Sequence, residues 1–302
     1  MNQPLLKILP IVAVFFAGVA LRRLGWLQRR HADLLLRIVV YVGLPALILS
    51  SLTRIELRAD LALLPLCAVL TVLATWPVVL GVGRALRLPR ASLGAFVTGA
   101  MIMNMAFEYP FVLLAWGEEG FARLALFDLG SGLLVLTLVY GQACWFGSGR
   151  ADPRATLRGV AAFPPLWALL LALGINLGDV TIAPALTDVL RAVGGTLVLL
   201  VMLALGLYFD LRLLGTRVLA WGIAMRSGLG LVLGWVWVEL FALHGLTRAV
   251  VLLAVAAPVG FNTLVFAARE GLDRELAASL ASVSMLLALL YLPVLLVFLS
   301  GT

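Results

Sequence analysis

Residues 103 to 110 read MNMAFEYP and place an amide, a carboxyl group and a proline in the middle of an otherwise apolar run. A second apolar run carries a related stretch, APVGFNT, at residues 257 to 263. Proline removes a backbone donor, glycine permits unusual dihedral angles, and asparagine can cap a broken helix or bind a ligand. The two stretches therefore predict two interrupted helices that build one site, although each proline could instead only kink a continuous helix.

The sequence around these stretches is that of an integral membrane protein. Of 302 residues, 63% are hydrophobic and 12% are charged, and the mean hydropathy is +1.12. A soluble core could not bury so much apolar surface. Apolar runs long enough to cross roughly 30 Å of hydrocarbon predict ten transmembrane helices, at residues 5–21, 34–52, 61–83, 93–116, 121–147, 159–176, 185–208, 217–243, 247–268 and 275–299.

The positive charges predict the orientation, because Lys and Arg in short loops tend to remain in the cytoplasm. The connections after the odd-numbered runs hold fourteen of them: Arg22, Arg23, Arg29, Arg30, Arg84, Arg87, Arg90, Arg150, Arg154, Arg158, Arg212, Arg217, Arg269 and Arg274. The opposite set holds six: Lys7, Arg54, Arg58, Arg123, Arg191 and Arg248. We therefore expect a multi-pass protein of the inner (plasma) membrane with both termini extracytoplasmic.

The most polar internal linker follows the fifth run and reads GSGRADPRATLRG at residues 147 to 159. Because five is odd, the second half of the chain must start on the opposite side of the membrane, which produces an inverted repeat if both halves share a fold. The sequence thus predicts an all-α membrane protein of two inverted five-helix repeats, residues 1–147 and 159–302, with a cytoplasmic linker at 148–158. The interrupted helices are the fourth and the ninth.

Three ionisable residues lie inside the apolar runs. Glu108 is central in the fourth run, where an acid costs on the order of 3 kcal/mol unless it is neutralised or hydrated. We expect it to carry a proton or bind a cation; the alternatives are a structural ion pair or an acid that faces a water-filled vestibule. Asp128 is a second candidate for ion coupling, and Arg226 could supply the positive counter-charge for an anionic substrate. For these last two residues a structural role is equally open.

Other classes of function find no support in the sequence. The net charge of +7 is spread over short clusters between apolar runs, without interleaved aromatics, so we expect no nucleic-acid partner. The two histidines, His31 and His244, form no paired metal signature, and neither a P-loop nor a nucleophile elbow is apparent. We expect no enzymatic activity, no metal site and no cofactor.

Three stretches resemble the auxin efflux carrier family, which includes PIN-like carriers and bacterial malate or malonate permeases. They are RRLGWLQRRHADLLLRIVVYVGLPALILSSL at residues 22 to 52, the Asn and Pro of the fourth run followed by WGEEG, and FNTLVFAAREGLDRELAAS at residues 261 to 279. The resemblance covers most of the chain. It implies a scaffold domain and a transport domain, in an elevator transporter for organic anions whose fold is similar to that of bile acid sodium symporters.

The resemblance also implies a site. The family's crossing residues map to Asn104 and Pro110 in the fourth run and to Pro258 and Asn262 in the ninth, beside the substrate. The family usually has Gly-x-Pro after the first Asn, whereas this chain reads NMAFEYP, one residue shorter and with Glu108 close to the expected Gly. An added carboxylate would repel a carboxylate ligand unless it were protonated, which suggests proton coupling or another class of substrate.

Our working hypothesis is a secondary carrier of a small organic anion such as a carboxylate. Asn104, Asn262 and the exposed backbone would hold the substrate in the bilayer, half-helix N-termini would favour the anion, and Glu108 would exchange a proton. One alternative is a sodium-coupled symporter, with Glu108, Asp128 or nearby carbonyls around Na⁺, and another is a membrane ligand sensor without transport. The sequence is compatible with a homodimer, and the solute and its direction stay open.

Overall fold

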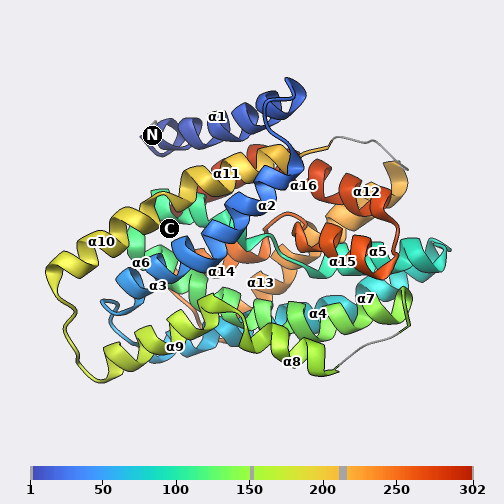
Figure 1. Cartoon of the computed structure of the whole chain (residues 1–302). Helices are drawn as coiled ribbons and strands as arrows, with labels where there is room; N and C mark the ends of the chain where they lie inside the picture. The colour runs from blue at the N-terminus through green and yellow to red at the C-terminus, as the bar shows by residue number, and fades with distance from the viewer. Residues whose placement is uncertain (1–2, 150–152, 211–215, 301–302) are drawn as a thin grey trace.

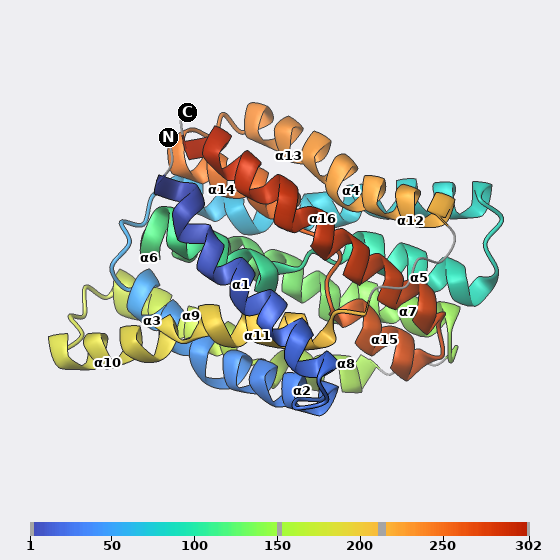
Figure 2. The same ribbon diagram turned by 90° about the horizontal axis from the view of Figure 1, so that it is seen from above.

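The helices of this chain run through a single bundle, in which α1 begins and α16 ends at the same end (Figures 1 and 2). The computed structural model describes residues 3–149, 153–210 and 216–300, and every regular element in these ranges is helical. Arg150 and Arg212, which entered the charge pattern, and part of the predicted linker lie outside the described residues.

Helix formation follows the apolar runs of the sequence. The helices are α1 (Gln3–Arg23), α2 (Arg29–Ile38), α3 (Leu44–Leu52), α4 (Leu63–Ala85), α5 (Arg90–Met101), α6 (Met105–Leu134), α7 (Tyr140–Phe146), α8 (Pro153–Ala161), α9 (Pro164–Leu177), α10 (Pro184–Gly195), α11 (Leu197–Tyr208), α12 (Thr216–Ile223), α13 (Leu229–Leu240), α14 (Gly245–Val255), α15 (Asn262–Glu270) and α16 (Arg274–Ser300). Single π-helical turns at Val39–Gly43, Val135–Val139 and Ala224–Gly228 join α2 to α3, α6 to α7 and α12 to α13.

Six continuous helical stretches in the described ranges are long and apolar enough to cross a membrane. They are Arg29–Leu52, Ala59–Ala85, Met105–Phe146, Pro184–Tyr208, Arg217–Leu240 and Arg274–Ser300. The helices α9 and α14 are apolar but shorter. An all-helical chain with this many apolar spans has the architecture of a multi-pass membrane protein, because only internally hydrogen-bonded segments are stable in hydrocarbon.

Two of the predicted spans are interrupted in the structure. The run at 93–116 divides into α5 and the start of α6, and the run at 247–268 divides into α14 and α15. The long helix α6 contains a further discontinuity at Gly117, where φ is 61° and ψ is −155°. This glycine lies between the predicted fourth and fifth spans, and its positive φ is a conformation that side chains with a Cβ atom rarely adopt.

Helix packing divides the chain into two sets. In the first helix set, α1 and α2 pack against α11, and α3 packs against α9 and α10. The second helix set comprises α4 to α7 and α12 to α16, in which α4 packs against α5, α6 and α13, while α14 packs against α6 and α13. Across the boundary, α3 and α11 contact α6. The two sets are thus distinct packing units that meet mainly along α6, with further contacts from α1 to α6 and α16.

Small residues allow the closest contact within the first helix set. A Cβ atom on Gly18 of α1 would lie 2.6 Å from the Leu203 carbonyl oxygen, and one on Gly206 of α11 would lie 2.1 Å from that of Phe15. Glycine at both positions therefore lets the two backbones touch, as is common where helices associate in a membrane.

Candidate functional site

The two interrupted helices of the second helix set meet at their breaks. The residues between α5 and α6, 102 to 104, form an antiparallel bridge with those between α14 and α15, in which Met103 pairs with Val259. The Asn104 N–H donates to the Pro258 carbonyl at 2.9 Å, and the Gly260 N–H donates to the Ile102 carbonyl at 2.9 Å. Each break thus satisfies backbone groups of the other, which non-helical backbone at membrane depth requires. We call this arrangement the crossing.

Side chains complete the crossing. Asn104 caps α6, because its Oδ1 accepts from the Phe107 N–H at 3.2 Å. Its Nδ2 donates to the Val259 carbonyl at 3.4 Å, and the Val259 N–H donates to Ser284 Oγ of α16 at 3.0 Å. Gly260 is required by the close approach, since a Cβ atom there would lie 2.4 Å from a methyl group of Ile102.

A cavity of about 220 Å³ lies beside the crossing, between the two helix sets. The first residues of α6 and of α15 line it, so two helix N-termini lie on one cavity. The first helix set contributes Val40 and Leu44, and Phe163 closes the wall before α9. The other lining residues are Ile102, Met103, Asn104, Met105, Ala106, Tyr109, Asp128, Ser131, Gly132, Val135, Leu136, Gly260, Phe261 and Asn262.

Asp128 is the acid of this cavity. Its Oδ2 accepts from the Tyr109 hydroxyl at 2.5 Å, and its Oδ1 accepts from the Ser131 hydroxyl at 2.9 Å. Among the described residues that line the cavity, Asp128 alone has a charged side chain, and none is Lys, Arg or His. The site therefore combines one carboxylate with the partial positive charge of two helix N-termini.

The structure places some of the predicted site residues at the cavity or the crossing and others away from both. Asn104, Asn262 and Asp128 line the cavity. Pro258 belongs to the second break and supplies a carbonyl to the crossing. Pro110 belongs to neither break. It lies inside α6, because this helix begins at Met105, directly after its N-cap residue Asn104.

Glu108 and Arg226 are buried away from the lining of the cavity. Glu108 lies in the first turn of α6 with none of its side chain exposed, and neither carboxyl oxygen has a hydrogen-bond partner among the described residues. Arg226 is equally buried and donates from Nη1 to the Ala100 carbonyl at 3.1 Å and from Nη2 to the Val255 carbonyl at 3.0 Å. Its partners are thus the ends of α5 and α14.

Sequence reasoning did not place Tyr109 or Ser131 in the site. The bond from Tyr109 joins residues on opposite sides of the Gly117 discontinuity, which no helical spacing relates, whereas Ser131 lies three residues after Asp128 in the same helix. Sequence reasoning did not place Ser284 in the site either, because its bond to Val259 depends on how α16 lies against the second break. The one available signal was the presence of hydroxyl groups within apolar runs.

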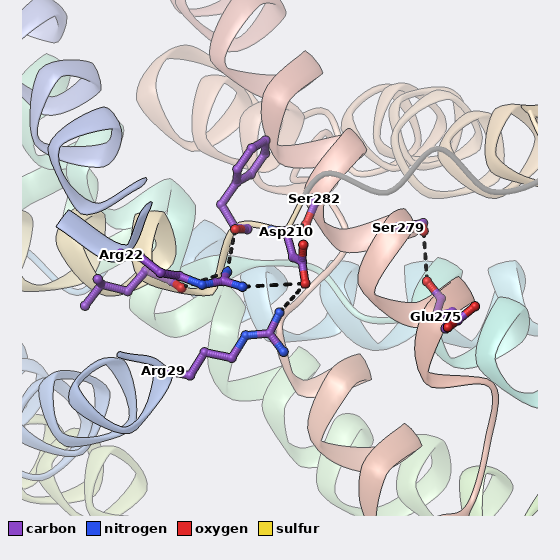
Figure 3. A network of polar contacts seen from close by, with 8 residues as sticks. Arg22, Arg29, Asp210, Glu275, Ser279 and Ser282 are labelled. Carbon is purple, nitrogen blue, oxygen red and sulfur yellow. Dashed lines mark hydrogen bonds and ion pairs between the residues drawn. The ribbon is translucent and has the colours of Figure 1, made fainter. Parts of the chain in front are cut away.

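A second polar network joins the two helix sets where α11 ends (Figure 3). The Asp210 carboxylate follows α11 and pairs with Arg29 at 2.5 Å and with Arg22 at 3.6 Å. The Asp210 N–H donates to Ser282 Oγ of α16 at 3.0 Å. One residue thus contacts both helix sets.

Comparison of the sequence with known proteins places this chain among transporters. Residues 153–296 match the family model described as "Membrane transport protein". The chain is 30% identical over 293 residues to a protein of Methanothermobacter thermautotrophicus described as an "uncharacterized transporter", with 95% of each chain covered. It is 28% identical over 289 residues to an "uncharacterized transporter" of Methanocaldococcus jannaschii, with 91% of this chain and 92% of that protein covered.

Proposed function

The chain belongs to the auxin efflux carrier family of membrane transport proteins, and on this premise we propose that it is a secondary transporter that moves a small organic anion together with a proton. One observation carries the proposal: two helix N-termini and a single carboxylate lie on the same cavity. The N-termini attract an anion, and the carboxylate opposes it until a proton is added.

The anion would bind where α6 and α15 begin. Unpaired N–H groups and the helix dipole make a helix N-terminus a favourable place for a carboxylate. Asn262 lies at the first position of α15 and adds an amide donor. Aliphatic, methionine and phenylalanine side chains form much of the remaining wall, which suits the apolar body of an organic acid.

The proton would bind Asp128. Two carboxylates in one small cavity repel each other, so the anion binds best when Asp128 is neutral. The hydroxyl groups of Tyr109 and Ser131 can reorient and accept as well as donate, so they can serve either protonation state of Asp128. Glu108, the stronger candidate in the sequence, becomes the second candidate because it does not line the cavity.

The two helix sets support an elevator movement. The whole crossing belongs to the second helix set, while Val40 and Leu44 of the first set form the facing wall. Sliding the second set past the first would carry the cavity across the bilayer within a ten-helix inverted repeat. Contacts such as that between Asp210 and Ser282 would have to open during this movement.

The test is uptake into proteoliposomes that contain the purified full chain. Mono- and dicarboxylates would be screened with an imposed pH gradient, in sodium and in choline at the same pH. We expect uptake of at least one acid to follow the pH gradient and not sodium. Asp128→Asn should abolish the response to the pH gradient, whereas Asp188→Asn, a matched change on the exposed face of α10, should preserve it.

Two results would count against the proposal. Uptake that requires sodium at constant pH would favour a sodium-coupled symporter. An unchanged response to the pH gradient in Asp128→Asn would remove this residue from coupling and return Glu108→Gln as the variant to examine.

A further inference from the structure

The two half-helices that lead into the crossing end beside one buried cation. The last turns of α5 and α14 present the carbonyl groups of Ala100 and Val255, and Arg226 donates to both from a side chain that is fully buried. A guanidinium group carries its charge permanently and offers a planar fork of donors. Because the C-terminal end of a helix is partially negative, one cation here neutralises two helix ends.

The backbone around Arg226 is shaped for this contact. Arg226 lies in the π-helical turn Ala224–Gly228, a feature that often marks functional positions. One turn later, a Cβ atom on Gly230 would lie 2.2 Å from the Val255 carbonyl oxygen and 2.8 Å from Nη2 of Arg226. Only glycine therefore lets α13 approach the end of α14 closely enough for the guanidinium to reach it.

The neighbouring carbonyl groups also have donors from the protein. The Tyr291 hydroxyl donates to the Ala256 carbonyl at 2.6 Å, and the Ser227 hydroxyl lies 3.5 Å from the Ala257 carbonyl oxygen. Together with Arg226, these side chains meet three consecutive carbonyls where α14 ends. In transporters with broken helices, such carbonyl groups and half-helix C-termini are the groups that coordinate Na⁺.

We propose that Arg226 is a tethered cation that occupies the carbonyl site a dissociable Na⁺ would take, so that the crossing is held together without sodium. The consequence for coupling rests on the proposed transport function. Because Arg226 fills this site, the coupling ion would bind Asp128, the acid of the cavity. Arg226 is thus a positioning residue and not a counter-charge for the substrate.

The test is thermal unfolding of the purified full chain in detergent, in sodium chloride and in choline chloride at equal ionic strength. The wild type should unfold at the same temperature in both salts. Arg226→Ala should unfold about 5 °C or more lower, because it leaves two carbonyls without a donor. Guanidinium chloride, at millimolar concentrations far below denaturing ones, should restore most of this loss, and sodium should stabilise the variant more than choline does.

Two further variants keep the test decisive. Arg226→Lys retains the charge and should lie between the wild type and Arg226→Ala. Gly230→Ala places a Cβ atom against the same Val255 carbonyl but creates no cavity, so guanidinium should not restore the unfolding temperature of this variant. If Arg226→Ala does not fold, the lysine variant and the salt comparison on the wild type carry the test.

Sodium-specific stabilisation of the wild type would overturn the proposal, as would an Arg226→Ala variant that responds alike to guanidinium, sodium and choline. No substrate is present in this measurement. A failure of the tethered cation is therefore distinguishable from a failure of proton-coupled transport.

Discussion

The two breaks that form the crossing each carry an asparagine, and the two side chains differ in burial and in their hydrogen bonds. Asn104 is 2% exposed, caps α6 and bonds to Val259 of the opposite break. Asn262 is only partly buried and is itself the first residue of α15, a helix that begins after Phe261 without a side-chain cap. Both line the cavity, but only the second stands at an uncapped helix end.

This difference assigns separate roles to the two halves of the site. At a capped N-terminus one of the free N–H groups already donates to the side chain of the cap residue, whereas at an uncapped N-terminus these groups are available to a ligand. We therefore infer that the first break mainly holds the crossing together and that the second mainly binds the anion.

The largest effect is expected where the two breaks touch. Gly260→Ala places a Cβ atom against Ile102 and the Met103 carbonyl, so the breaks must separate. Overpacking of this kind costs about 1 to 3 kcal/mol, and it should show as a lower midpoint of thermal unfolding together with loss of uptake. The control is Gly174→Ala in α9, where a Cβ atom meets nothing within 4 Å. Equal stability of the two variants would mean that the breaks do not depend on this contact.

A smaller effect is expected from the support that α16 gives to the second break. Ser284→Ala removes the acceptor of the Val259 N–H and leaves a buried donor unpaired, which costs about 1 to 2 kcal/mol. Ser279→Ala is the matched control, because its hydroxyl bonds within α16, to the Glu275 carbonyl. The measurement is again the unfolding midpoint in detergent. A larger loss in the control than in Ser284→Ala would contradict the assignment.

The comparison itself is sharpened by truncating each amide. Asn104→Ala should lower the free energy of unfolding by about 1 kcal/mol, the usual cost of a lost N-cap, with a reduced rate of uptake. Asn262→Ala should leave stability within about 0.5 kcal/mol and instead weaken the thermal shift produced by the transported acid. Reversal of this pattern, with Asn262 needed for stability and Asn104 only for binding, would exchange the roles of the two breaks.

The sequence anticipated both interruptions because asparagine and proline occur together in two apolar runs. It could not locate the first break, since the restart of α6 is fixed by the Asn104 cap and not by Pro110. It ranked Glu108 above Asp128 because the depth of a residue in a span sets the cost of its charge. The side of the helix on which a carboxyl group lies, however, decides whether it lines the cavity. That side depends on the turn at Gly117 and on packing against other helices, which one sequence does not specify.

The smallest effect separates the two prolines that the family resemblance placed at the substrate. Pro110 lies within α6, off the lining of the cavity, so Pro110→Ala can restore an N–H to the helix without touching the crossing. We expect unchanged uptake and an equal or slightly higher unfolding midpoint.

Pro258→Ala keeps the carbonyl that accepts from Asn104 but releases the fixed φ of the second break, so a modest loss of stability is expected there. The two variants would be compared in the same unfolding and uptake assays. Loss of uptake in Pro110→Ala at unchanged stability would show that the first proline acts on the substrate after all. It would then extend the ligand site from the start of α6 to the interior turn that holds Pro110.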